Sequence, residues 1–213
     1  MSDLTTLDTL LDLHGTTYAE EAGIRLRDTP QPLYQLLVLS HLLSARIRAS
    51  VAVAAARALY ARGMRTPRRM ADATWQQRVD ALGEGGYRRY DERTATQLGD
   101  GAVLLLDEHG GDLRRLRREA DGDDGALRRA LQRFPGMGPT GADIFVREVQ
   151  TVWPETAPFL DAKALQGAER LGLPTSPAGL TGLAEGRDPA VLAAALVRTA
   201  LDKHLTAQVR SAA

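Results

Sequence analysis

The sequence predicts an all-α protein built of two helical lobes. Alanine, leucine and arginine are abundant among the 213 residues, and these residue types lose little conformational freedom in a helix. Apolar side chains recur at the three- and four-residue spacing of amphipathic helices. No segment shows the strict alternation of a half-buried strand, and glycine and proline divide the chain at intervals typical of helices.

The first half of the chain divides into helices at Pro30, Pro32 and Gly63. The apolar stretch 33–62 is long for one helix, so we expect two that meet near 44–48. Thr66 and Pro67 have the order of an N-cap followed by a first-turn proline. The predicted helices are, in order, 4–13, the two within 33–62, one restarting at 66–67, 74–82, 87–98, 102–108 and 113–119.

In the second half, the acidic segment 121–125 is predicted to be a loop, and the last residues, 210–213, to be loose. The predicted helices there are 126–133, 140–149, 162–171, 177–183 and 190–205. We assign residues 31–149 to a helical barrel lobe, and residues 1–30 with 150–213 to a second helical lobe.

Composition excludes several classes of chemistry. Because the chain has no cysteine, it has no disulfide, no thiolate zinc site, no cysteine nucleophile and no iron–sulfur cluster. Its four histidines lack metal-ligand spacing, so we expect no metal site. The N-terminus does not have the form of a signal peptide, and the apolar runs are too short to span a membrane. We therefore expect a cytoplasmic protein.

The net charge is zero, but basic residues are unevenly distributed. Between residues 40 and 94, eleven arginines are offset by only five acidic residues. A local basic surface attracts phosphate even when the total charge is zero. The alternative is that these arginines form ordinary solvated helix faces. The arginines are at positions 46, 48, 57, 62, 65, 68, 69, 78, 88, 89 and 93.

The segment 134–141, Phe-Pro-Gly-Met-Gly-Pro-Thr-Gly, joins two predicted helices. Gly136 and Gly138 permit a tight reversal, and Pro139 suits the first position of the second helix. Such a turn leaves backbone N–H groups free at a helix N-terminus, where they and the helix dipole favour an anion such as phosphate. The alternative is a simple corner between helices.

Four segments, in the same order along the chain, resemble the endonuclease III-like DNA glycosylases. The segment 134–142 resembles the Leu-Pro-Gly-hydrophobic-Gly sequence of their helix-hairpin-helix motif. Leu36–Arg46 resembles an early helix that ends in Leu-Leu-Ser-Ala-Gln, and Tyr87–Ala95 loosely resembles the stretch after a Gly-x-Tyr turn. Phe159–Asp161, followed by Arg170–Leu173, resembles the Val-Asp-x-His segment and the Arg-Leu-Gly-Leu sequence downstream of it.

The resemblance covers about residues 30–175. It implies an endonuclease III-like fold and a monomeric base-excision repair enzyme. Its partner would be double-stranded DNA containing a lesion, and the damaged base would be flipped out of the duplex. The family binds the DNA backbone with its hairpin, which here implies Gly136, Met137, Gly138, Thr140 and Gly141. Family hairpin carbonyls also bind a monovalent cation.

By resemblance, Asp161 is the catalytic carboxylate. It would stabilise positive charge on the deoxyribose, and orient or deprotonate a water molecule, while the N-glycosidic bond breaks. The alternative is that Asp161 simply caps the helix 162–171, since aspartate is a strong N-cap residue. The two roles are compatible.

The sequence departs from the family pattern at several positions. Thr140 occupies the place of the lysine that forms a Schiff base in bifunctional members, so we expect a monofunctional glycosylase with doubtful lyase activity. Lys163 replaces a common histidine and is either a substitute nucleophile or a phosphate or solvent contact. Arg46 replaces the glutamine that fills the gap left by the flipped base, and it either fills that gap, binds phosphate or faces solvent. The 21-residue spacing from Thr140 to Asp161 exceeds the expected value.

Two other functions remain open from the sequence. One is a non-catalytic helix-hairpin-helix protein that binds DNA, and the other is a helical protein-interaction domain. The base that would be excised is not indicated by any residue.

Overall fold

A computed structural model describes residues 2–213. The described chain is helical and contains no strand, which confirms the all-α prediction. It divides into two compact units, one of Ala19–Val146 and the other of Met1–Tyr18 with Arg147–Ala213. Residues 19–30, which we had assigned to the lobe of the chain ends, therefore belong to the unit that contains 134–141. Within residues 2–213, every helix is too short or too polar to cross a bilayer.

The unit of residues 19–146 is organised around one buried helix. Its helices are α2 (Tyr18–Glu21), α3 (Pro30–Leu43), α4 (Ala49–Ala61), α5 (Pro67–Asp72), α6 (Trp75–Glu84), α7 (Asp91–His109), α8 (Leu113–Ala120), α9 (Asp124–Leu131) and α10 (Pro139–Val149), which continues past the unit boundary. Every residue of α3 from Leu33 to Leu42 is buried. Since α3 is covered on all sides, it forms the core on which the other helices pack.

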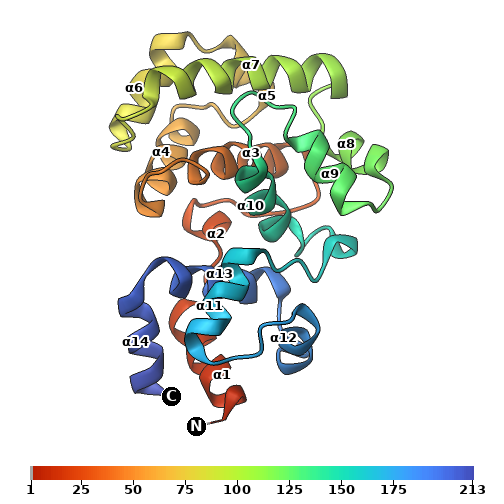
Figure 1. Ribbon diagram of the computed structural model, residues 1–213. Coiled ribbons are helices and arrows are strands. Elements are labelled where there is room, and N and C mark those ends of the chain that lie inside the picture. Colours follow the sequence, from red (N-terminus) through yellow and green to blue (C-terminus); the bar gives the residue numbers. More distant parts are fainter. Residues whose placement is uncertain (1) are drawn as a thin grey trace. The chain divides into compact units, whose positions relative to one another are not determined.

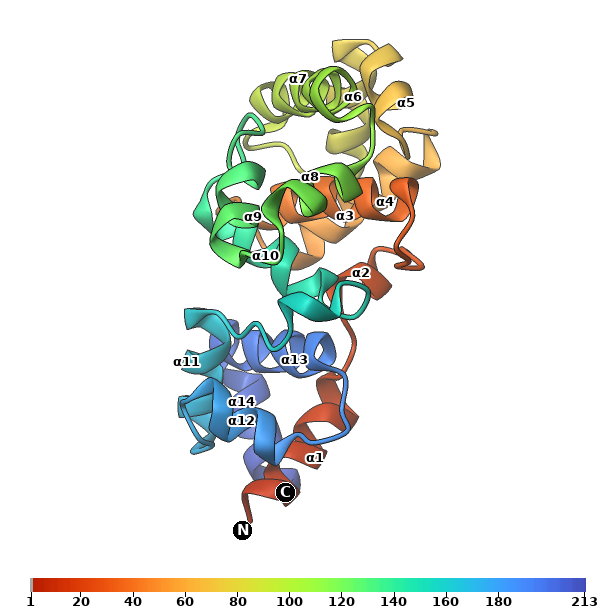
Figure 2. The same cartoon turned by 90° about the vertical axis from the view of Figure 1, so that its right-hand side faces the viewer.

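Helix α7 differs from the prediction, which divided it into 87–98 and 102–108. It is one continuous helix of 19 residues. Gly99 and Gly101 lie inside it because both face neighbours at close range. Gly99 faces the buried side chain of Arg78, and Gly101 faces Phe134 of the loop between α9 and α10. Figures 1 and 2 both show this loop reaching toward α7.

The unit of the two chain ends is organised around α13. Its helices are α1 (Asp3–His14), the 3-10 helix η1 (Pro154–Thr156), α11 (Ala162–Leu171), α12 (Pro177–Leu183), α13 (Pro189–Leu201) and α14 (Lys203–Ala212). Helix α13 lies beside α11 (Figure 2), and its residues 192–197 are all buried.

The C-terminal region also differs from the prediction of one helix over 190–205. The chain breaks at Asp202, whose side chain accepts a hydrogen bond from the backbone of His204 and so begins α14. Residues 210–212, which were predicted to be loose, belong to α14. Capping by aspartate explains the break, since a capped N-terminus competes with continuation of the preceding helix.

Gly167 allows α11 and α13 to approach closely. We predict that Gly167→Ala lowers the free energy of unfolding by about 2–3 kcal/mol. A Cβ atom there would overlap the backbone carbonyl of Leu196, which cannot rotate away as a side chain does. Urea denaturation followed by circular dichroism measures the change.

Gly182→Ala is the matched control for this substitution. Gly182 lies inside α12, and no atom lies within 4 Å of the position of an added Cβ. This variant should be as stable as the wild type, or more stable by up to about 1 kcal/mol, because alanine is the better helix former. Equal stability of the two variants would contradict the close packing of α11 on α13.

Candidate nucleic-acid interface and Asp161 site

The hairpin loop, residues 134–141, comprises most of the connection between α9 and α10 and the first three residues of α10. An ion pair of 2.6 Å between Arg128 Nε and Asp143 Oδ1 links the two helices. Gly136 has φ of +79°, in the left-handed region that favours glycine. The Met137 N–H donates a 2.9 Å hydrogen bond to the Phe134 carbonyl and closes the turn. That amide, which belonged to the predicted DNA-binding set, is therefore not available to a ligand.

The remaining amides of the loop are unused. In the part of the chain that the structure describes, the N–H groups of Gly138, Thr140 and Gly141 donate no hydrogen bond. Pro139 has no N–H, and the first amide of α10 with an acceptor is that of Ala142, which bonds the Gly138 carbonyl at 3.1 Å. Free donors at the positive end of a helix dipole are the arrangement that binds phosphate.

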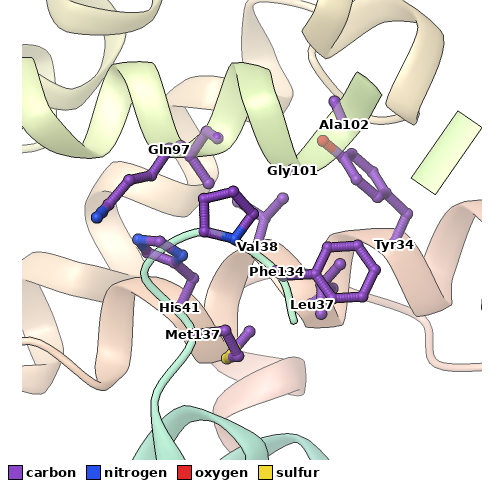
Figure 3. Close-up of a pocket in the computed structure, with 11 residues that line it drawn as sticks. Tyr34, Leu37, Val38, His41, Gln97, Gly101, Ala102, Phe134 and Met137 are labelled. Atoms are coloured by element: carbon purple, nitrogen blue, oxygen red, sulfur yellow. The ribbon is translucent and has the colours of Figure 1, made fainter. Parts of the chain in front are cut away.

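Two polar side chains support the hairpin loop at Gly136. An added Cβ at Gly136 would overlap the Gln97 side-chain amide and lie 2.6 Å from His41 Cε1. His41 of α3 and Gln97 of α7 lie side by side against the loop (Figure 3). The Met137 side chain is buried next to them. The backbone at Gly136 therefore rests on these two side chains, while Gly138 is half-buried and Thr140 is exposed.

His41 is a neutral histidine inside this support. Burial lowers the pKa of His41 to about 4; the side-chain hydrogen bond with Gln97 partly opposes this, and the charge of Arg93 reinforces it. Arg93 is an exposed residue of α7. His41 was missed from the sequence; its only signal is a histidine within the apolar stretch of α3.

Arg46 lies on the segment next to the hairpin. Gly141 packs against Met137 and against Ser44, whose Cβ is 3.4 Å from the position of an added Cβ. Ser44 ends α3, and Arg46 and Arg48 follow in the turn before α4. Both arginines are exposed, and neither forms an ion pair among the residues that the structure describes.

Several of the eleven arginines between residues 40 and 94 have structural roles. Arg78 is buried and donates to the carbonyls of Ala95, Met70 and Ala73. Arg62 forms an ion pair with Glu84. Fewer arginines are therefore free to form a basic surface than the count of eleven between residues 40 and 94 indicated.

Asp161 is the N-cap of α11 in the unit of the chain ends, which is the role that the sequence left open as the alternative to catalysis. Its Oδ1 accepts a 2.8 Å hydrogen bond from the Ala164 N–H. Its Oδ2 forms a 2.6 Å ion pair with Arg147 Nη1. The Arg147 and Asp161 side chains are only 3% and 9% exposed. Arg147 was missed from the sequence; its only signal is an arginine within the apolar stretch Ile-Phe-Val-Arg-Glu-Val.

Lys163 lies on the exposed surface of α11. Its Nζ forms a 2.8 Å hydrogen bond with Gln166 Oε1, three residues along the same helix. It lines a shallow surface depression with Glu169 and Thr175, and Asp161 is not among the lining residues. No contact of Lys163 with the Asp161 carboxylate is present.

The hairpin carbonyls fit the monovalent cation that the family resemblance implies. Among the described residues, no N–H donates to the carbonyls of Gly136 or Met137. Uncommitted backbone carbonyls are suitable ligands for hard cations. Over residues 2–213, no group of three histidine, aspartate or glutamate side chains is arranged to hold a metal ion.

Comparisons of the chain with protein-family models, with curated proteins and with solved structures found no match.

We predict that His41 makes folding sensitive to acid. Between pH 6.5 and about 4, His41 binds a proton in the unfolded chain but not in the folded protein. The unfolded state then holds more protons, so the free energy of unfolding falls between pH 7 and pH 4.5, by about 2 kcal/mol from this residue. Urea denaturation at pH 7 and pH 4.5 measures the fall, which should be smaller in His41→Gln.

His204→Gln, at an exposed histidine, is the control and should leave the pH dependence unchanged. An identical fall in wild type and His41→Gln would show that His41 does not remain neutral in the folded protein.

Proposed function

We propose that this protein binds double-stranded DNA through the hairpin loop and acts as a monofunctional base-excision glycosylase. The observation that carries the proposal is the set of unused amides at half-buried Gly138, exposed Thr140 and buried Gly141. Arg46, which is exposed and unpaired among the described residues, follows two residues after Ser44, which packs against Gly141. The endonuclease III-like arrangement of the two units is part of the same proposal.

Phosphate binding follows from the chemistry of the hairpin. Backbone amides bind phosphate oxygens without reading base sequence, which suits an enzyme that must scan DNA. Arg46 adds an exposed positive charge two residues after Ser44, which packs against Gly141. A monovalent cation held by the Gly136 and Met137 carbonyls would add further positive charge to the same loop.

We predict that duplex binding weakens steeply with salt, and that Arg46→Ala reduces the slope of log K against log salt concentration by about 0.9. Each phosphate contact releases counterions from the duplex, so loss of one contact lowers the slope by that amount. Fluorescence anisotropy with a labelled duplex measures both quantities.

Arg62→Ala is the matched control for Arg46→Ala, because Arg62 belongs to the same unit but is paired with Glu84. It should leave the slope unchanged. A wild-type affinity that is independent of salt would exclude phosphate contacts and favour a helical protein-interaction domain.

Asp161 is the proposed catalytic residue. A carboxylate has about four acceptor positions, and the bonds from Ala164 and Arg147 use two of them. The other two can bind a water molecule and accept its proton as it attacks C1′ of the deoxyribose. The negative charge also stabilises the positive charge that develops on the sugar as the base leaves.

Hydrolysis, rather than a lyase reaction, fits the residues of the hairpin. Thr140 cannot form a Schiff base with the sugar. Lys163 is engaged with Gln166 on the outer surface of α11. Water is therefore the proposed nucleophile.

A second candidate function is a DNA-binding protein without catalytic activity. The observation that favours it is that both Asp161 oxygens already have partners, one in the N-cap and one in the ion pair. In that case Asp161 and Arg147 only fasten α11 to α10.

We predict that Asp161→Asn lowers the rate of base release at least about 100-fold, while duplex affinity changes less than twofold. Asparagine retains the N-cap but loses the negative charge. The measurement is free-base release from a panel of duplexes, each with one lesion, under single-turnover conditions. Circular dichroism checks that the variant is folded.

Asp188→Asn is the control for this substitution. Asp188 is the N-cap of α13 in the same unit and has no arginine partner among the described residues. It should release base at the wild-type rate. No release by the wild type from any duplex that it binds would select the second candidate function.

A further inference from the structure

Gln150 fixes the backbone just before Asp161. Its side chain is buried, and its amide pairs reciprocally with Phe159, since Oε1 accepts from the Phe159 N–H at 2.8 Å and Nε2 donates to the Phe159 carbonyl at 3.1 Å. Nε2 also donates to the carbonyls of Arg147 and Pro189. The segment that leads to Asp161 is therefore bonded to α10 and to the start of α13.

Arg147 fixes the Asp161 side chain itself. The carboxylate has one oxygen on the Ala164 amide and the other on Arg147 Nη1. Two bonds to two different oxygens fix both the rotation of the carboxylate and its position. Together with Gln150, Arg147 holds the segment 159–161 at its backbone and at its side chain.

The arginine is not arranged for the strongest ion pair. Arg147 binds Asp161 through Nη1, and its Nε is buried without a hydrogen-bond partner among the described residues. A buried donor without a partner destabilises the protein, and a buried ion pair is itself weak evidence of stabilisation. Stability alone therefore does not account for an arginine at this position.

We infer that Arg147 and Gln150 are positioning residues for the Asp161 carboxylate in base excision. The inference rests on the proposed function. Arg147 keeps the carboxylate facing one direction, and Gln150 keeps the backbone of residue 159 from moving. Neither residue contacts the substrate in this proposal, so both act on the rate of bond cleavage and not on the affinity for DNA.

The test compares Arg147→Met, Arg147→Lys and the control Arg170→Met. Arg170 lies on α11 and donates to the Thr199 carbonyl, so its loss removes a structural guanidinium of the same unit without touching Asp161. For each protein we would measure duplex affinity by anisotropy and the single-turnover rate of base release with saturating protein. Hydrogen exchange at the Ala164 amide reports whether the Asp161 cap persists.

Arg147→Met is expected to lower the single-turnover rate roughly 10- to 100-fold, with affinity within twofold of the wild type. Arg147→Lys should recover part of the rate, and Arg170→Met should match the wild type. If Arg147→Met does not fold, an intermediate rate with wild-type affinity in Arg147→Lys supports the inference, and a wild-type rate contradicts it.

Two results would overturn the inference alone. One is a wild-type rate in Arg147→Met while Asp161→Asn is inactive, and the other is a loss of rate matched by an equal loss of affinity. If the wild-type protein releases no base from any duplex, the proposed function fails, and the positioning role falls with it.

Discussion

The unused amides of the hairpin depend on the contact of one glycine with two polar side chains. Gly136 has no Cβ and a positive φ, so its backbone rests directly on His41 and Gln97. Met137 is then drawn into the interior, and its amide is used to close the turn. The chain leaves this contact at Gly138 with its next N–H groups pointing away from any acceptor. Any larger residue at 136 would lift the loop from its support.

The Asp161 site depends on a different kind of constraint, a buried charge pair. Removing one partner of such a pair is strongly destabilising, although an apolar pair of the same size is often just as stable. The pair therefore specifies a geometry more than it supplies stability. The Nε of Arg147 is buried without a hydrogen-bond partner in the described part of the chain, which lowers stability. This cost indicates that Arg147 serves to orient the Asp161 carboxylate more than to stabilise the protein.

The sequence predicted features that are encoded locally. The position of the hairpin and the helix boundaries at proline depend on residues a few positions apart, and so does the N-cap role that the sequence left open for Asp161. Features set by distant partners were not predictable. Glycine usually interrupts helices, but α7 continues through Gly99 because Arg78, 21 positions earlier, packs against it. Arg147 likewise acquires its partner only when residue 161 is folded against it.

A net charge of zero does not argue against phosphate binding in this fold. Many of the charges cancel in pairs that have structural roles, such as Arg128 with Asp143, which links the helices on either side of the hairpin. The donors that the proposed phosphate would meet at the hairpin are backbone N–H groups, which add nothing to the formal charge but carry the positive end of the α10 dipole. The count of charged side chains therefore does not report the donors that matter for phosphate binding at the hairpin. The relevant quantity is the number of amides that the folded loop leaves without an acceptor.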